Sequence, residues 1–487
     1  MKNKKIYITF SFLLSFLSVG LANKVLENDT FSAIKIGEYI LKHGIDFKEH
    51  LNEFNTLNYH NARWLFNVII SFINDHFGFA GIYILVMVVS ALIALTIFNV
   101  LLKKRLNIYI SFFLTAITMV FLREFLVPRA QIFSYLFLVL EIFFIERILS
   151  YNKKTDYIWL LIIGVLFANI HTTLWLMSLI VILPYFAEYL LFKNKQVKKI
   201  RFLSFNDISL KRLIMIFLVV LITGFITPLG LLPFTYMIKT LISLKETVTI
   251  QELQPIVISS TYGVYFIIYI IFIFTLLYNR FKFRISDVFM ITGLGILAVD
   301  ASRNLPMFYI IVTLILGRII SNKISEYSKK EDIVMERITK MHFITVMITI
   351  VLLLVSSYLL YTNINNEYVN KGYSPVRIAD YILENYDDNV IIFNDFNTGA
   401  YLEYRGIKTF IDSRSEIYCK AFNDTSIMQD FGLITTGNKH YDEIFEKYNI
   451  KLVIVSNDFG IDIYINKDKN YKKILKEEYF TLYEKIQ

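Results

Sequence analysis

The sequence has few of the features that soluble enzymes use for disulfide cross-links or for nucleotide chemistry. It contains one cysteine, Cys419, so no disulfide forms within the chain and no cysteine-rich metal site exists. It also lacks a G-x-x-x-x-G-K-[ST] loop, a G-x-G-x-x-G turn and an H-E-x-x-H helix. These absences argue against ATP hydrolysis, dinucleotide chemistry and zinc-dependent hydrolysis. Glycine (18) and proline (7) are few, and we find neither low-complexity tracts nor a repeat.

Apolar residues are abundant instead. Hydrophobic residues make up 55% of the 487 residues, and the mean hydropathy is +0.52. A soluble domain this apolar would aggregate, whereas a membrane protein needs about 20 mostly apolar residues for each span. The net charge of +9 fits Lys and Arg in cytoplasmic loops. Because no basic soluble domain with interleaved aromatic residues occurs, we expect no nucleic-acid partner.

The apolar runs predict about eleven membrane-spanning helices. The first, near residues 6–21, follows Lys2, Lys4 and Lys5. Gly20-Leu21-Ala22 is an acceptable signal-peptide cleavage site, but the many later spans favour an uncleaved first span. The later runs lie near residues 80–102, 107–122, 131–149, 157–170, 173–192, 213–228, 258–278, 285–299, 305–320 and 342–361.

Charge predicts the orientation of these spans. With the amino terminus in the cytoplasm, the basic loops at 103–105, 153–154, 193–212, 280–284 and 318–340 all fall on the cytoplasmic side. The expected external segments are 23–79, 123–130, the turn at His171, 229–257, 300–304 and everything after residue 361. Helical spacing of apolar residues within 23–79 and 229–257 predicts interfacial helices.

The composition changes after the last span. Residues 1–361 are expected to form the membrane domain and residues 362–487 a small extracytoplasmic α/β domain. Strands are predicted at 390–393, 409–411 and 452–455, and helices at 375–385 and 441–448, with a turn and short helix at 394–404. The fold class is therefore a polytopic α-helical membrane protein with a C-terminal α/β domain.

Two carboxylates, Glu27 and Asp29, follow the first span almost immediately. A carboxylate near a cleft at the membrane edge acts as a general base when it reaches the proton that it removes. The alternative is an ordinary solvated acidic loop.

Cationic groups occupy the short external turns. Arg123 and Arg129 flank one turn, and a guanidinium there can hold a phosphate; snorkelling from a helix end is the alternative. Asn169 and His171 form another turn, where the histidine either binds a phosphate or is simply hydrogen-bonded. Asp300 and Arg303 flank a third turn, where they form either a structural ion pair or a binding site for an anion.

Three further groups are less specific. Glu141 is the one acid well inside a span, and its role is left open. Asp395 and the run Asp412-Ser413-Arg414 follow strands, where loop hydrogen bonds are a more common use than ligand binding.

The order of these motifs resembles the GT-C superfamily of membrane glycosyltransferases, and within it the bacterial proteins similar to dolichyl-phosphate-mannose:protein mannosyltransferases. The matching segments span nearly the whole chain. They are Asn28-Asp29-Thr30-Phe31 with 34–40, Asn61-Ala62-Arg63-Trp64-Leu65-Phe66, Arg129-Ala130-Gln131-Ile132-Phe133-Ser134, Ala168-Asn169-Ile170-His171 and Asp412-Ser413-Arg414. Ala130 replaces the usual proline of that family, and Ser413 replaces a glycine.

The resemblance implies transfer of a sugar from a polyprenyl-phosphate donor to an acceptor hydroxyl, on a glycan, lipid or protein, at the outer face of the cell membrane. Asp29, with Glu27 as second choice, would take the acceptor's proton. Arg129, His171 and Arg303 would hold the phosphate, supported by Asp300, Asn169 and Arg123. No cofactor is required, although some superfamily members use a divalent cation.

Two other functions are compatible with the sequence. A transporter or flippase of lipid-linked saccharides would need charges distributed through the bundle and usually an internal repeat. A non-catalytic protein of cell-envelope assembly would use its external domain and would tolerate replacement of Asp29.

Overall fold

The computed structural model describes residues 2–486 except 55, 195, 244–250, 327–341, 439 and 458–459. Glu246, an acid of the predicted external segment 229–257, and residues 327–340 of the basic loop predicted at 318–340 therefore lie outside the described residues. The chain divides into two compact units. Unit 1 comprises residues 1–24, 83–233 and 251–366, and unit 2 comprises residues 25–82, 234–250 and 367–487.

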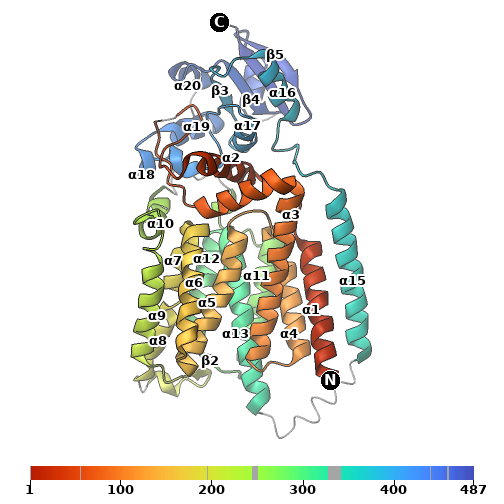
Figure 1. Ribbon diagram of the computed structural model, residues 1–487, viewed down its shortest axis with the longest axis vertical. Helices are drawn as coiled ribbons and strands as arrows, with labels where there is room; N and C mark the ends of the chain where they lie inside the picture. The colour runs from red at the N-terminus through yellow and green to blue at the C-terminus, as the bar shows by residue number, and fades with distance from the viewer. Residues whose placement is uncertain are drawn as a thin grey trace. The chain divides into compact units, whose positions relative to one another are not determined.

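Unit 1 is a bundle of long apolar helices (Figure 1). Each predicted apolar run coincides with a helix. Inside a membrane no water is available to hydrogen-bond the backbone N–H and C=O groups, and a helix pairs these groups with one another. The helices are α1 (Lys2–Leu21), the second half of α3 (Trp64–Lys103), α4 (Ile108–Phe121), α5 (Gln131–Tyr151), α6 (Lys154–Ile170), α7 (Thr172–Ile180), α8 (Leu183–Phe192), α9 (Leu210–Thr223), α11 (Thr261–Tyr278), α12 (Ile285–Asp300), α13 (Leu305–Glu326) and α15 (His342–Asn365).

Neighbouring helices in unit 1 include consecutive helices and helices from distant parts of the chain. Helix α1 packs against α15 and α4, α5 against α6, and α12 against α8 and α13. Two short strands, β1 (Leu203–Ser204) and β2 (Phe283–Arg284), pair in parallel between helices. Five of the described helical segments are long and apolar enough to cross a membrane by length and composition.

One predicted run is interrupted. The run near 173–192 forms α7 and α8, and the two helices are separated by Val181 and Ile182. The backbone amide of Val181 still bonds to the carbonyl of Met177, so the interruption is a local turn.

Unit 2 contains a four-stranded sheet in the order β3-β4-β6-β5. Strands β3 (Ile392–Asn394) and β4 (Leu452–Ser456) are parallel, and β6 (Phe480–Lys485) runs antiparallel to β4 and to β5 (Tyr471–Lys476). The helices of this unit are α2 (Asn28–His43), the first half of α3, α10 (Leu232–Ser243), α16 (Val376–Asn385), α17 (Gly399–Tyr404), α18 (Lys420–Asn423), α19 (Ile427–Thr435), α20 (Tyr441–Lys447) and α21 (Ile461–Ile465).

The first loop of the chain belongs to the same core as the C-terminal residues. Ile36 and Ile40 of α2, with Leu57 and Tyr59 of the following loop, are buried in one cluster with Phe410 and other residues around the sheet. Helix α3 changes direction at Gly78, whose φ of 61° is unfavourable for other residues. The segment from α2 to Gly78 is thus part of the folded unit that contains the sheet.

The predicted strand at 409–411 is wrong. The side chain of Asn394 takes the place of a neighbouring strand, because its Oδ1 accepts a hydrogen bond from the Phe410 amide at 3.0 Å and its Nδ2 donates to the Ile411 carbonyl at 2.8 Å. A side chain that satisfies these backbone groups removes the need for a strand ladder. The helices predicted at 375–385 and 441–448 and the strands at 390–393 and 452–455 are confirmed, with small shifts at their ends.

The run Asp412-Ser413-Arg414 is buried. Arg414 is 1% exposed and donates to Glu49 at 2.7 Å, to Asp412 at 2.6 Å and to Glu403 at 3.1 Å. Burial raises the pKa of Glu403 well above its usual range, although Arg414 lowers it. Arg414 therefore links Glu49, in the loop before α3, to Glu403 and Asp412 in the C-terminal part of the chain.

Candidate functional site

The acidic pair predicted after the first span lies at the start of α2 in unit 2. Glu27 is the N-cap residue with extended backbone, and Asp29 lies in the first helical turn, where a negative charge is favoured by the helix dipole. Asp29 Oδ2 forms an ion pair of 3.0 Å with Nη1 of Arg63, the residue before α3. Each of these two side chains is 15% exposed, so the pair is neither buried nor fully solvated.

Three side chains surround this ion pair. Tyr59 precedes Arg63 in the same loop, Glu416 lies in the 3-10 helix η6 (Ser415–Tyr418), and Tyr236 lies on α10. The Tyr236 hydroxyl donates a hydrogen bond to the Glu416 carboxylate. Burial raises the pKa of Glu416, while the positive charge of Arg63 lowers it and the negative charge of Asp29 raises it further.

Arg129 of unit 1 forms an ion pair with a residue distant in sequence. Its Nη1 lies 2.6 Å from Oε1 of Glu252, in the 3-10 helix η3 (Gln251–Leu253). The Arg129 side chain is 19% exposed and that of Glu252 is 51% exposed. By contrast, Arg123 lies in η1 (Arg123–Phe125) and pairs only loosely, at 3.7 Å, with the adjacent Glu124. Both Arg123 and Glu124 are about half exposed.

His171 and Asn169 are held tightly at the turn between α6 and α7. The Nδ1 atom of His171 lies 2.6 Å from Oγ of Ser134 on α5, and the histidine is 4% exposed. The Asn169 side chain donates to the carbonyls of Val165 and Ile226, both at 2.8 Å. Asn169 therefore fixes the turn on which His171 sits.

Asp300 ends α12, and Arg303 lies in η4 (Ser302–Asn304). Both side chains are exposed. Among the described residues of unit 1, no ion pair joins these two. Their turn is instead held through the backbone, because Ser302 donates to the Gln254 carbonyl at 3.2 Å and Ile256 donates to that of Val299 at 3.0 Å. The segment that carries Glu252 thus contacts both the Arg303 turn and Arg129.

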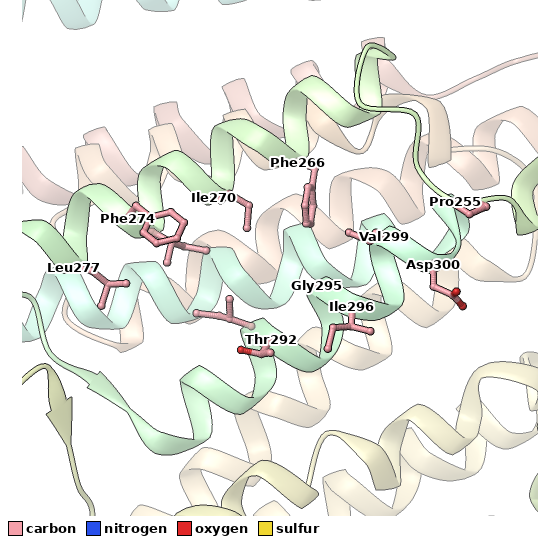
Figure 2. Close-up of a pocket in the computed structure, with 12 residues that line it drawn as sticks. Pro255, Phe266, Ile270, Phe274, Leu277, Thr292, Gly295, Ile296, Val299 and Asp300 are labelled. Atoms are coloured by element: carbon pink, nitrogen blue, oxygen red, sulfur yellow. The ribbon is translucent and has the colours of Figure 1, made fainter. Parts of the chain in front are cut away.

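An apolar groove begins at this turn. It has a volume of about 580 Å³ and lies between α11 and α12 of unit 1. Figure 2 shows Phe266 and Ile270 of α11 facing Ile296 and Val299 of α12, with the Asp300 carboxylate at one end. Its lining is apolar apart from Thr292 and Asp300, so the groove suits a hydrocarbon chain.

The described residues, outside the gaps given above, contain no group of three or more His, Cys, Asp or Glu side chains that is placed to hold a metal ion. The acidic residues of α2 do not by themselves fit a divalent cation, because such ions take six or more oxygen ligands and a guanidinium lies 3.0 Å from the Asp29 carboxylate.

Sequence reasoning missed Glu416 and Tyr236. Neither belongs to a motif, and each comes from a segment far along the chain from Asp29. Arg63 belongs to one of the segments that carry the family resemblance, but no spacing in the sequence predicts its ion pair with Asp29. The structure thus brings Asp29 together with Arg63 and Glu416, and Arg129 together with Glu252.

Comparison with solved structures identifies the fold. The chain is similar to the oligosaccharyltransferase from Archaeoglobus fulgidus, with a TM-score of 0.54 and 12% identity over 92% of this chain and 69% of that one. It is also similar to ArnT from Cupriavidus metallidurans in the apo state, with a TM-score of 0.54 and 12% identity over 99% of this chain and 98% of that one. ArnT bound to undecaprenyl phosphate matches with a TM-score of 0.53 and 11% identity, over 98% and 97% of the two chains.

No protein-family model matches the chain, and no curated protein sequence matches it. The structural likeness nevertheless defines a class: the protein has the fold of the GT-C membrane glycosyltransferases. The resemblance drawn from the order of the sequence motifs is confirmed at the level of this fold.

Proposed function

We propose that this protein transfers a sugar from a polyprenyl-phosphate-linked donor to an acceptor hydroxyl on the outer face of the membrane. The observation that carries the proposal is the likeness to ArnT over nearly the full length of both chains, including the form bound to undecaprenyl phosphate. Fold alone does not define an activity, so the residues must be able to perform the reaction.

The groove of unit 1 supports a lipid-linked donor. An isoprenoid chain gains free energy in proportion to the apolar surface that it removes from water, and the groove between α11 and α12 offers apolar side chains along its length. In this proposal the phosphate is held by Arg129, His171 and Arg303, with Asn169, Asp300 and Arg123 in supporting roles. Preorganised cations lower the barrier because the leaving polyprenyl phosphate develops negative charge in the transition state.

The acceptor side requires a carboxylate. The acceptor hydroxyl loses its proton as its oxygen forms a bond to the anomeric carbon, and the bond from that carbon to the phosphate oxygen breaks. Asp29 is the first candidate to receive the proton, and Glu27 the second. Asp29 is the better placed of the two because its side chain is accessible beside Arg63, whereas Glu27 caps α2.

The orientation is part of the same proposal. About eleven spans, a cytoplasmic amino terminus and an extracytoplasmic α/β domain after residue 361 would place both the acids and the arginine turns outside, where nucleotide sugars are not available. Protease protection of the C-terminal residues in sealed, inside-out vesicles tests this arrangement. Cleavage by added protease without detergent would refute it.

The decisive test is sugar transfer by the purified full-length protein in liposomes. The donors form a panel of polyprenyl-phosphate sugars, and Asp29→Asn is compared with the wild type. Asp75→Asn serves as the matched control, because Asp75 is an exposed acid of the same unit that takes no part in the ion pair. Release of polyprenyl phosphate by the wild type and the control, reduced about 100-fold or more in Asp29→Asn, supports the proposal.

Absence of turnover with every donor, in a folded protein, would refute the transferase and favour the non-catalytic alternative. The same assay repeated with EDTA tests the proposal that no divalent cation is required. Loss of turnover with EDTA and recovery with an added divalent cation would overturn that part alone.

A further inference from the structure

One wall of the apolar groove in unit 1 is recessed at Gly295. The residues of α12 that line the groove include Ile291, Gly295 and Val299, each separated from the next by about one helical turn. Residues with this spacing lie one above the other on the same face of a helix. Because Gly295 has no side chain, the wall has a gap between the side chains of Ile291 and Val299.

An aromatic ring forms the floor of this recess. A Cβ atom placed on Gly295 would lie 3.6 Å from Cε2 of Phe308 on α13, which is an ordinary van der Waals contact. Phe308 is buried, and its ring centroid lies 4.9 Å from that of Phe266, which lines the groove from α11. The recess therefore accommodates one methyl group on a surface of packed aromatic carbon.

The groove is long enough for a short stretch of a lipid chain. Its lining runs from Phe266 to Leu277 on α11 and from Ile291 to Asp300 on α12. At about 1.5 Å per helical residue, these stretches are roughly 16 Å and 14 Å long. An extended isoprene unit contributes four carbon–carbon bonds of about 1.5 Å, and so about 5 Å of length. The groove thus holds about three isoprene units, and the rest of a longer chain remains in the bilayer.

The polar end of the groove gives the chain a direction. Asp300 and Leu277 lie at opposite ends of the groove (Figure 2). The turn that follows Asp300 carries the exposed side chain of Arg303. A phosphate bound beside Arg303 directs its chain into the groove from this end. Gly295 lies roughly 7–8 Å before Asp300 along α12, so the recess is level with the second isoprene unit from the phosphate.

Shape, and not hydrophobicity alone, distinguishes the chains that compete for this groove. In a bilayer, prenyl chains and straight acyl chains are both already removed from water, so selection between them depends on packing. Each isoprene unit carries a methyl branch, whereas a straight acyl chain has none. A methyl group that enters the recess at Gly295 contacts the ring of Phe308 and gains dispersion contacts that a straight chain leaves unmade.

We propose that the groove between α11 and α12 selects the prenyl chain of the donor over the straight acyl chains of the surrounding bilayer, and that Gly295 determines this selectivity. The inference rests on the proposed function, which supplies a polyprenyl phosphate as the occupant. About three isoprene units next to the phosphate occupy the groove, with the methyl branch of the second in the recess. Gly295 is a specificity-determining residue and takes no part in making or breaking bonds.

The experiment measures binding of two phosphates to the full-length protein in liposomes, each at the same mole fraction of the membrane lipid. Farnesyl phosphate supplies three isoprene units, and hexadecyl phosphate supplies the same head group on a straight chain. The wild type is expected to bind farnesyl phosphate about tenfold more tightly, the effect of placing one small apolar group in a matching pocket. Undecaprenyl phosphate is expected to bind within about threefold of farnesyl phosphate, because its additional units lie outside the groove.

Gly295→Ala fills the recess without narrowing the rest of the groove. It is expected to weaken binding of farnesyl phosphate to the level of hexadecyl phosphate, whose own binding stays within about threefold of the wild type. Gly293→Ala is the matched control, because Gly293 is an exposed glycine of the same helix whose Cβ would meet nothing within 4 Å. It is expected to keep the wild-type preference. Gly295→Leu extends into the groove itself and is expected to weaken binding of both phosphates.

Three results would overturn the inference: equal binding of the two phosphates by the wild type, an unchanged preference in Gly295→Ala, or wild-type binding of both phosphates by Gly295→Leu. Melting temperatures in detergent show whether each variant is folded, and Gly295→Ala and Gly295→Leu test the groove independently. Sugar transfer measured on the same liposomes separates this inference from the proposed function. Turnover without a prenyl preference refutes the inference alone, whereas a prenyl preference that Gly295→Ala removes, without turnover by the wild type with any donor, refutes the transferase alone.

Discussion

Replacing Arg414 with methionine is expected to destabilise unit 2 strongly. The guanidinium is 1% exposed and makes charge-assisted bonds to Glu49, Glu403 and Asp412, each of which is fully buried. Methionine fills much of the same volume but supplies no donors. The substitution therefore leaves three carboxyl groups in the interior without their shared cation.

The size of the effect follows from the number of ionised groups left behind. Burial raises the pKa of Glu403 well above its usual range, although Arg414 lowers it. In the variant, all three buried carboxyl groups lose the hydrogen bonds and the positive charge of Arg414. Breaking a buried ion pair by removing one partner costs about 3–5 kcal/mol. At about 1.4 kcal/mol per factor of ten, that cost corresponds to an opening equilibrium about 100-fold to several thousand-fold less favourable to the folded state.

The single cysteine provides the assay without further engineering. Cys419 is 0% exposed and lies five residues after Arg414, with its Sγ 3.2 Å from the Ser415 carbonyl. A thiol reagent reaches it only when this part of unit 2 opens, so the labelling rate of the native protein reports the opening equilibrium. Arg414→Met is expected to increase this rate by the factor given above.

Arg405→Met is the matched control. Arg405 also forms an ion pair, 2.7 Å from Asp380, but its side chain is 26% exposed and that of Asp380 is 51% exposed. Such a pair contributes about 1 kcal/mol or less, so labelling is expected to rise less than about tenfold. Equal labelling rates for the wild type and Arg414→Met would refute the argument that the buried cluster holds this unit together.

Four other substitutions test separate parts of the structure. Glu403→Gln is expected to flatten the pH dependence of stability. A carboxyl group whose pKa is raised by folding stabilises the folded state below its unfolded pKa of about 4.3, and this contribution is lost as the pH rises. Melting temperatures measured in detergent between about pH 5 and pH 8 should therefore differ less in the variant than in the wild type. Gly37→Ala should destabilise unit 2 by about 1–3 kcal/mol in the Cys419 assay, because its Cβ would lie 2.0 Å from the Asn67 carbonyl oxygen, whereas Gly432→Ala, which meets nothing within 4 Å, should not. Arg318→Met should cost unit 1 about 3–5 kcal/mol, seen as a lower melting temperature in detergent, because Arg318 is 5% exposed and pairs with both Glu146 and Asp287. Glu252→Gln should tighten binding of undecaprenyl phosphate a few-fold, measured in liposomes at low salt, because it removes the carboxylate that neutralises Arg129; unchanged or weaker binding would argue against Arg129 as a phosphate ligand.

The helices were predictable because each is encoded locally. An apolar run long enough to span a bilayer has one low-energy conformation, and α5 and α11 follow their predicted ranges to within a few residues. The predicted strand at 409–411 failed because a single polar side chain, Asn394, meets its backbone groups instead. The β propensity of residues 409–411 does not reveal a side-chain partner that lies elsewhere in the chain.

The site was less predictable because its contacts are not local. Arg129 and Glu252 are 123 positions apart, and no spacing rule joins them. Glu416 lies in a turn of four residues without periodicity, and its significance depends on Asp29, Arg63 and Tyr236, which folding alone brings near it. The position of acids at span ends does not reveal that Asp29 forms an ion pair with Arg63.

Exposure distinguishes three of the arginine–carboxylate groups among the described residues, those of Arg414, Arg63 and Arg129. Arg414 directs its bonds to three buried carboxyl groups and is 1% exposed, so a ligand would have to break native bonds to reach it. Arg63 and Arg129 are 15% and 19% exposed, and each has a carboxylate within ion-pair distance. An arginine in that state is already desolvated in part but still accessible, and it binds a second anion at lower cost than a solvated one. For this reason the Asp412-Ser413-Arg414 run, although part of the family resemblance, is a structural element, whereas the exposure of Arg63 and Arg129 leaves these two arginines accessible to an anion.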